Sequence, residues 1–255
     1  MSKIVMVSGA WHGKWCWERV VPLLTDRGFD VITPELLGMG DDKTPLKDVT
    51  LARWTDQIAQ VVVDQNEPVV LLGHSRGGIV ISEVAEKVPQ SISQLIYLSA
   101  FMLRDGESMG TVLARRASDA KPNFLQPAAD GASATVMPEF IDKVFYNTTS
   151  PELVERAKKR MGGEPLTSFG TPLHLTRERY ETVPRAYIEC QRDRAVPLEL
   201  QRELQAQLPC YPVATMDTDH CPFMSDPEGL VEAIAKVVQE QADKYPNGHR
   251  SELQR

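Results

Sequence analysis

Cysteine is scarce in this chain and widely spaced, at positions 16, 190, 210 and 221 of 255 residues. No C-x-x-C pair occurs, which excludes a zinc ribbon and a thioredoxin-type redox motif. Four thiols in a chain of this length do not make a disulfide scaffold either. The chain is long enough to bury about three quarters of its unfolded surface, and we expect one large domain or two small ones.

Long hydrophobic runs are also missing from the sequence. No apolar run approaches the ~18 residues that a membrane span needs. The first residues, MSKIVMVSGAW, contain a short apolar strand but no signal-peptide core and no small-residue cleavage site. We therefore expect no membrane association, no signal peptide and a cytoplasmic location.

Basic residues are outnumbered by acidic ones, 28 to 35, which gives a formal net charge of −7. A negative balance argues against a protein that coats nucleic-acid phosphates. Hydrophobic residues make up 42% and charged residues 25%, as in ordinary globular proteins. The oligomeric state is not specified by these features, and a homodimer stays open.

Short apolar runs alternate with helical patterns at both ends of the chain. The apolar runs predict strands at residues 3–8, 29–36, 68–73, 94–100, 185–190 and 211–217. Helical patterns follow them, including one that starts with Asp226 as N-cap and Pro227 at the first helical position. Strands and helices in this order predict an α/β fold, with a mostly parallel sheet and helices on both faces.

The alternation stops after residue 100 and returns near residue 185. We expect an α/β core from residues 1–106 and 181–245, with a cap or lid inserted at 107–180. Residues 246–255 form a polar C-terminal tail that we expect to be frayed.

The segment Gly73–Gly77 (GHSRG) matches the nucleophile motif G-x-S-x-G. The motif alone is weak, but here it directly follows an apolar strand and opens a helix, as the motif requires. The tight turn exposes the serine Oγ above the sheet edge, and the flanking glycines prevent side-chain collisions. We therefore predict Ser75 as a nucleophile; a phosphate-binding or purely structural turn is the alternative.

A serine needs a base and an acid to become a nucleophile. His220 follows the strand at 211–217, in a loop that reaches the same sheet edge as Ser75. Asp193 follows the strand at 185–190 and gives the chain order Ser, acid, His. We predict His220 as base and Asp193 as acid, with Asp105, Asp217 and Asp219 as competitors for the acid.

With these residues placed, the sequence resembles the α/β-hydrolase superfamily. Within it, the chain resembles the group of plant methylesterases and hydroxynitrile lyases, with their bacterial relatives. The resemblance rests on segments spread from residue 9 to residue 220: 9–17 (GAWHGKWCW), 21–24 (VPLL), 73–78 (GHSRGG), 187–193 (YIECQRD), 196–197 with Gln201, and Asp219-His220.

The resemblance implies carboxylic ester hydrolysis through an acyl-enzyme, without a cofactor. It also implies an oxyanion hole made by two backbone N–H groups, those of Ala10 and Arg76. Each donor of this kind is worth about 3 kcal/mol to the transition state. The sequence offers no metal constellation, and His12 and His220 lack the paired spacing of metal ligands on a helix.

Two positions distinguish the activities within the group. The lyases have a threonine where this chain has Gly9, and a lysine where Cys221 follows the catalytic histidine. Both differences favour the esterase. Two positions depart from the group's usual pattern: Ser8 replaces a histidine, and Arg76 replaces an apolar residue after the nucleophile. We expect the Arg76 side chain to point outward at the helix start, rather than toward an anionic substrate group.

The candidates for substrate contact are Gly9, Trp11, His12, Phe101 and Met102, although aromatic and methionine residues are as often ordinary core. They predict a small-to-medium, partly apolar ester. Two alternatives remain open: a hydroxynitrile lyase that uses the same residues as acid and base, and a ligand-binding receptor that has lost fast chemistry.

Overall fold

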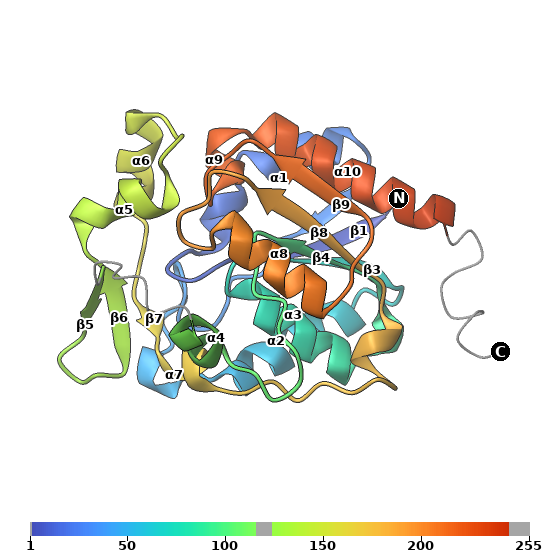
Figure 1. The fold of residues 1–255 in the computed structure, drawn as a ribbon, viewed down its shortest axis with the longest axis horizontal. Helices are drawn as coiled ribbons and strands as arrows, with labels where there is room; N and C mark the ends of the chain where they lie inside the picture. Colours follow the sequence, from blue (N-terminus) through green and yellow to red (C-terminus); the bar gives the residue numbers. More distant parts are fainter. Residues whose placement is uncertain (1, 116–123, 245–255) are drawn as a thin grey trace.

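A computed structural model describes residues 2–115 and 124–244 of the chain. Its main sheet has six strands in the order β2-β1-β3-β4-β8-β9, and all neighbouring pairs are parallel (Figure 1). The strands are β1 (Lys3–Val7), β2 (Asp30–Ile32), β3 (Val69–His74), β4 (Ile92–Leu98), β8 (Arg185–Cys190) and β9 (Val213–Met216). The expected α/β fold with a parallel sheet is confirmed.

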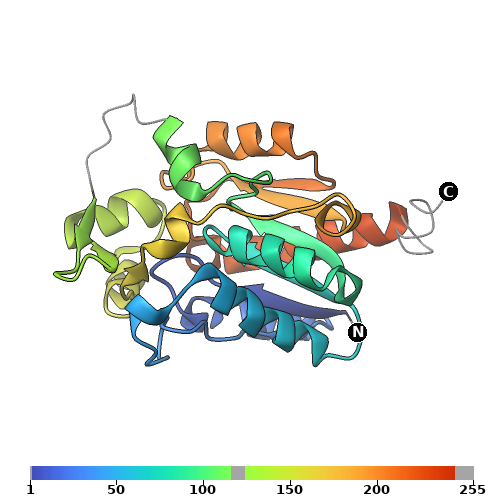
Figure 2. The ribbon, with the colours of Figure 1, turned by 90° about the horizontal axis from the view of Figure 1, so that it is seen from below.

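Helices cover both faces of this sheet. They are α1 (Val20–Asp26), α2 (Leu51–Val63), α3 (Gly77–Lys87), α8 (Leu198–Gln207), α9 (Pro222–Ser225) and α10 (Pro227–Lys244), with 3-10 turns at η1 (Lys14–Trp17), η2 (Leu46–Asp48), η3 (Pro89–Ser91) and η4 (Tyr180–Thr182). In Figure 2, α2 and α3 lie in front of the sheet and α10 lies behind it. Two hydrophobic clusters, one on each side, hold the layers together.

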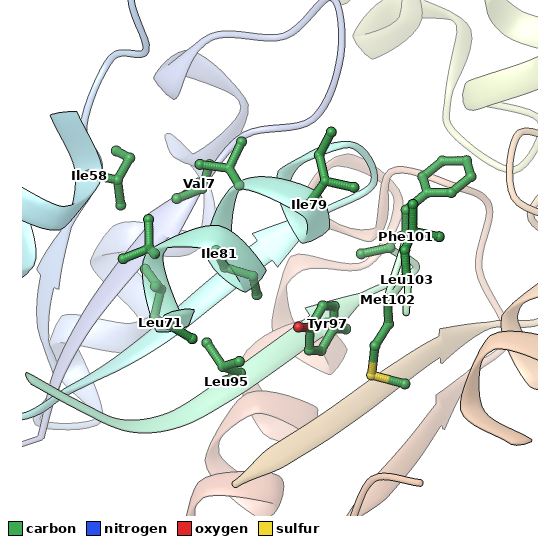
Figure 3. Packing of buried hydrophobic residues seen from close by; sticks show 14 of the residues in the cluster. Val7, Ile58, Leu71, Ile79, Ile81, Leu95, Tyr97, Phe101, Met102 and Leu103 are labelled. Atoms are coloured by element: carbon green, nitrogen blue, oxygen red, sulfur yellow. The ribbon is translucent and has the colours of Figure 1, made fainter. Parts of the chain in front are cut away.

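Successive strand residues alternate between these two clusters, because side chains in a strand point to opposite faces. Val5, Leu71 and Leu95 pack with α2, α3 and α8 on one face. Figure 3 shows Leu71 and Leu95 near Ile81 of α3. Ile4 and Leu72 pack with α1 and α10 on the other face. The continuous apolar runs of the sequence arise because both faces of the sheet are covered.

Local signals set several element ends. Asp226 caps α10, with its carboxylate accepting a bond from the Gly229 N–H at 3.0 Å. β2 is shorter than expected from residues 29–36, because Pro34 has no N–H to give to a ladder. Pro151 is the first residue of another helix, and Ser150 before it makes no side-chain cap bond.

Residues 107–180, called the inserted segment here, connect β4 to β8. The described part of this segment, residues 107–115 and 124–180, contains a small antiparallel sheet in the order β5-β6-β7 and four short helices (Figure 1). The elements are α4 (Met109–Arg115), β5 (Leu125–Pro127), β6 (Ser133–Val136), α5 (Pro138–Phe145), α6 (Pro151–Lys158), β7 (Glu164–Pro165) and α7 (Thr167–Gly170). The boundaries of a cap remain a prediction, and the expected tail at 246–255 lies outside the described residues.

Within residues 2–115 and 124–244, none of the helices combines the length and apolar character needed to cross a membrane.

Candidate active site

Ser75 occupies the sharp turn between β3 and α3, with a positive φ of 54° and 7% of its surface exposed. A Cβ at Gly73 would lie 2.6 Å from the Gly77 carbonyl oxygen, and one at Gly77 would lie 2.9 Å from the Val7 carbonyl oxygen. Only glycine fits at these two positions. The strand–turn–helix setting predicted for the motif is therefore present, and the backbone at Ser75 is held in the strained conformation that such a turn requires.

His220 and Asp193 meet although 27 residues separate them in sequence. His220 lies in the loop after β9 and Asp193 in the loop after β8, and the His220 Nδ1 to Asp193 Oδ2 distance is 2.6 Å. Both side chains are buried. The Asp193 Oδ1 accepts bonds from the Ala195 and Val196 N–H groups at 2.7 and 2.8 Å. The carboxylate is thus fixed by the backbone on one side and bonded to the imidazole on the other.

His220 also lies beside the Ser75 turn. The neighbour of Ser75, His74, donates its Nε2 proton to the His220 carbonyl oxygen at 2.8 Å, and the two rings are 4.5 Å apart. Burial lowers the pKa of His74 well below its ordinary value, so this imidazole is neutral. The ring of His74 is used to hold the His220 loop, and the turns that carry Ser75 and His220 are in direct contact.

The loop after β1 packs against the same turn. A Cβ at Gly9 would lie 2.6 Å from His74 Nδ1 and 2.9 Å from Ser75 Cβ. The absence of a side chain at Gly9 therefore lets the backbone that leads to Ala10 approach the serine closely.

His12 is a buried residue of that same loop. Its Nδ1 donates to the Ala10 carbonyl oxygen and its Nε2 accepts from the Tyr146 hydroxyl, both at 2.6 Å. Desolvation by burial lowers the pKa of His12 to about 4. Both ring nitrogens are thus used within the protein, and substrate contact by His12 stays a prediction.

The outward orientation expected for Arg76 is wrong. Its side chain is completely buried, and its Nε lies 2.8 Å from Glu164 Oε1 on β7 of the inserted segment. The guanidinium also stacks over the Trp54 ring, 4.1 Å from its centroid. The sequence predicted a solvated helix start because the partner carboxylate lies 88 residues away along the chain.

Aromatic side chains from the loop after β1 and from the inserted segment gather next to His220. The Trp11 ring lies 5.5 Å from Phe145, and Phe145 lies 5.6 Å from the His220 ring. Phe124 and Phe169 complete the cluster around Trp11. This cluster gives the neighbourhood of the imidazole an apolar wall.

Phe101 and Met102, the other two candidates for substrate contact, are buried in the core cluster above β4 and β8. Their side chains point in opposite directions from the chain (Figure 3). Met102 is 0% exposed, and its packing in the core is sufficient to explain a methionine there. Contact of either residue with substrate stays a prediction.

Three residues near the site were not found from the sequence. Ser99 donates its hydroxyl proton to Asp193 Oδ2, Glu164 binds Arg76, and Tyr146 binds His12. Ser99 follows β4 at the same sheet edge as Ser75, which is the one signal that could have found it. Glu164 and Tyr146 belong to the inserted segment, where no motif marks them. No group of three metal-binding side chains occurs in the part of the chain that the structure describes.

Comparison with known proteins assigns the chain to a family. The sequence model of the alpha/beta hydrolase family matches residues 4–233. The chain belongs to the α/β-hydrolase family. This match confirms the superfamily that the sequence resembles, and it spans both the main sheet and the inserted segment.

Similar members of the family are named as ester-cleaving enzymes. The chain is 32% identical to the pyrethroid hydrolase of Sphingobium wenxiniae, over 95% of this chain and 90% of that one. It is 31% identical to methylesterase 1 of Arabidopsis thaliana, over 94% and 96% of the two chains. The crystal structure of polyneuridine aldehyde esterase covers 93% of this chain and 99% of its own with a TM-score of 0.84, at 25% identity. The narrower resemblance to plant methylesterases and their bacterial relatives is confirmed as well.

Proposed function

We propose that this α/β-hydrolase cleaves small-to-medium, partly apolar carboxylic esters through an acyl-enzyme on Ser75. The proposal rests above all on the buried contact of 2.6 Å between His220 and Asp193, at the sheet edge where the Ser75 turn lies. A serine hydroxyl, an imidazole and a carboxylate on three separate loops are the three groups that acyl transfer of this kind uses. The chain is a carboxylic ester hydrolase by family and by relatives, which include methylesterases and pyrethroid hydrolases.

In the first half of the reaction, Ser75 Oγ attacks the ester carbonyl carbon while His220 Nε2 takes the hydroxyl proton. Asp193 accepts a hydrogen bond from the Nδ1–H group of His220. This bond fixes the tautomer that leaves Nε2 free to act as base. The resulting imidazolium is stabilised by the carboxylate. It then gives its proton to the leaving alcohol as the tetrahedral intermediate collapses to the acyl-enzyme.

In the second half, water takes the place of the alcohol. His220 removes a proton from that water as it attacks the acyl carbonyl carbon. The tetrahedral intermediate then collapses, the bond to Ser75 Oγ breaks, and His220 gives its proton to that oxygen as the acid is released. In both halves the negative charge on the carbonyl oxygen is held by the backbone N–H groups of Ala10 and Arg76. The close approach of Gly9 to Ser75 Cβ supports this placement of the oxyanion hole.

The substrate is a small molecule whose acyl or alcohol portion is apolar. Trp11 and Phe145 form the apolar wall next to His220, and we propose the inserted segment, residues 107–180, as a cap that shapes this side of the site. Gly9 and Cys221 provide neither the hydroxyl nor the ammonium that a cyanohydrin lyase uses. A cytoplasmic location and a homodimer remain predictions.

The test is pre-steady-state kinetics on a panel of esters. We expect p-nitrophenyl acetate and butyrate to give a burst of one p-nitrophenol per protein, followed by slower turnover. Methyl esters of aromatic acids and a pyrethroid extend the panel to the compounds named in the relatives. The variant Ser75→Ala should lose the burst and turnover together.

Two results would contradict the proposal. Release of cyanide from mandelonitrile without ester turnover would identify a lyase. Tight binding of an ester without any burst would identify a receptor.

A further inference from the structure

The guanidinium of Arg76 connects three parts of the molecule that are distant in sequence. Its Nη2 donates to the Gly9 carbonyl oxygen at 3.1 Å, and its Nε and Nη2 face the two oxygens of Glu164 at 2.8 and 3.4 Å. Glu164 Oε2 in turn accepts a bond from the Trp11 N–H at 3.0 Å. Arg76 and Glu164 are both 0% exposed. The pair therefore links the Ser75 turn, the loop after β1 and the inserted segment in the interior of the protein.

These bonds fall on the peptide units on both sides of Ala10. The Gly9 carbonyl and the Ala10 N–H belong to one planar trans peptide, so their directions are opposite and fixed relative to each other. A bond from Arg76 to the Gly9 oxygen therefore also sets the direction of the Ala10 N–H. The following peptide is held at both ends, because His12 Nδ1 donates to the Ala10 oxygen and Trp11 N–H donates to Glu164.

We infer that the Arg76–Glu164 pair is a positioning device for the oxyanion hole. Arg76 supplies one oxyanion donor through its own backbone N–H and orients the second, Ala10 N–H, through its side chain. Glu164 holds the guanidinium in place from the inserted segment, so that the position of that segment is coupled to the geometry of the hole. The inference rests on the proposed function, because it assigns a task within the same site.

The energetics of the pair favour this interpretation over a purely stabilising role. A buried ion pair costs desolvation of two charges and is often replaceable by apolar residues without loss of stability. Among the described residues, Arg76 Nη1 has no hydrogen-bond partner, so the guanidinium is not even fully satisfied. The positive charge of the guanidinium, bonded to the Gly9 oxygen, also polarises the peptide and makes the Ala10 N–H a stronger hydrogen-bond donor. An apolar residue would give neither the orientation nor the polarisation.

The test compares Arg76→Leu, Glu164→Leu, the double variant with both changes, and the conservative Glu164→Gln. We expect Arg76→Leu to lower kcat on the order of 10²-fold, as a misplaced catalytic group does, while KM changes little. Glu164→Gln keeps one acceptor oxygen and should retain more of kcat than Glu164→Leu. Arg202→Leu is the control, because it removes another arginine–glutamate pair, with Glu189 on β8, in which the arginine is exposed; its kcat should equal the wild-type value.

Stability and position are separated by the double variant. Each single leucine leaves an unpaired buried charge and lowers Tm, whereas the double variant has no such charge and should regain Tm. Its kcat should stay low, because the Gly9 carbonyl oxygen then keeps only the 3.4 Å bond from the His12 N–H. The affinity of a trifluoromethyl ketone, whose serine adduct carries an oxyanion, should weaken in parallel with kcat/KM across the series.

Recovery of kcat together with Tm in the double variant would overturn the inference and make the pair merely structural. Wild-type kcat in Arg76→Leu would overturn it too. A failure of the proposed function is distinguishable, because in that case the unsubstituted protein itself would show no burst and no covalent ketone adduct.

Discussion

The parallel sheet and the inserted segment contribute to the site in different ways. The sheet carries Ser75, Ser99, Asp193 and His220, each in the turn or loop after the carboxyl end of a strand. The inserted segment carries Glu164, Phe145 and Tyr146, which contact the site from outside the sheet. The topology of the sheet thus brings together the groups that we propose to react, and the inserted segment supplies contacts to the residues around them.

The largest effect is expected from removing a reacting group of the sheet. His220→Ala deletes the proposed base, and kcat for p-nitrophenyl acetate should fall roughly 10⁴-fold to 10⁶-fold, as in other triad knockouts. His174→Ala, which changes an exposed histidine of the inserted segment, is the control and should keep wild-type kcat. A kcat of His220→Ala within tenfold of the wild-type value would show that His220 is not the base.

A substitution in the inserted segment should change selectivity more than chemistry. Phe145→Ala removes a buried ring between Trp11 and His220 and should lower the free energy of unfolding by about 3–5 kcal/mol. Measured below the melting temperature, it should shift the preference among acyl chain lengths, while the burst with acetate remains. An unchanged chain-length profile would show that this ring does not border the substrate.

Acidification should weaken the contact between the two regions through His12. The ordinary pKa of a histidine is 6.5, and burial lowers the pKa of His12 to about 4 in the folded protein. Between these two pH values the unfolded chain therefore binds a proton that the folded chain does not. The free energy of unfolding should therefore fall as the pH drops from 6.5 to 4, by about 3 kcal/mol in total. Buried His74 acts in the same direction.

Urea unfolding at pH 7 and pH 5 measures this effect. His12→Asn should reduce the difference between the free energies of unfolding at the two pH values, and His174→Asn should leave that difference unchanged. Equal stability of the wild-type protein at both pH values would contradict a neutral buried His12.

The smallest effect is expected from the cap of a helix in the sheet region. Asp226→Ala removes the N-cap of α10 and should cost about 1 kcal/mol of stability. Denaturant unfolding should show this loss, with kcat and KM unchanged. A change in kcat would show that the cap of α10 affects catalysis as well as stability.

The parts of the molecule that could be predicted from sequence are those with local signals. The apolar run at residues 68–73 and the glycines around Ser75 predicted β3, its turn and α3, and the structure has them at Val69–His74 and Gly77–Lys87. The loops of Asp193 and His220 were predicted at one edge because parallel strands end there, and the chain order Ser, acid, His favoured Asp193 over its competitors. The structure brings their side chains together as expected, and their roles stay predictions.

The contacts of the inserted segment could not be predicted in this way. Glu164 lies in a two-residue strand, which is too short to show any periodicity. Its bond to Arg76 depends on the path of 88 intervening residues, and no local pattern encodes that path. An arginine after the serine was therefore interpreted as solvated, since the partner that neutralises it was not visible in the sequence.

The central claim is that the hydroxyl of Ser75 is the group that attacks the substrate. It is tested most directly by treating the protein with a fluorophosphonate and locating the adduct by peptide mass mapping. The account predicts one adduct per chain, on Ser75, that forms at the wild-type rate in Arg202→Leu and is absent in His220→Ala. An adduct on any other residue, or full labelling without His220, would contradict it.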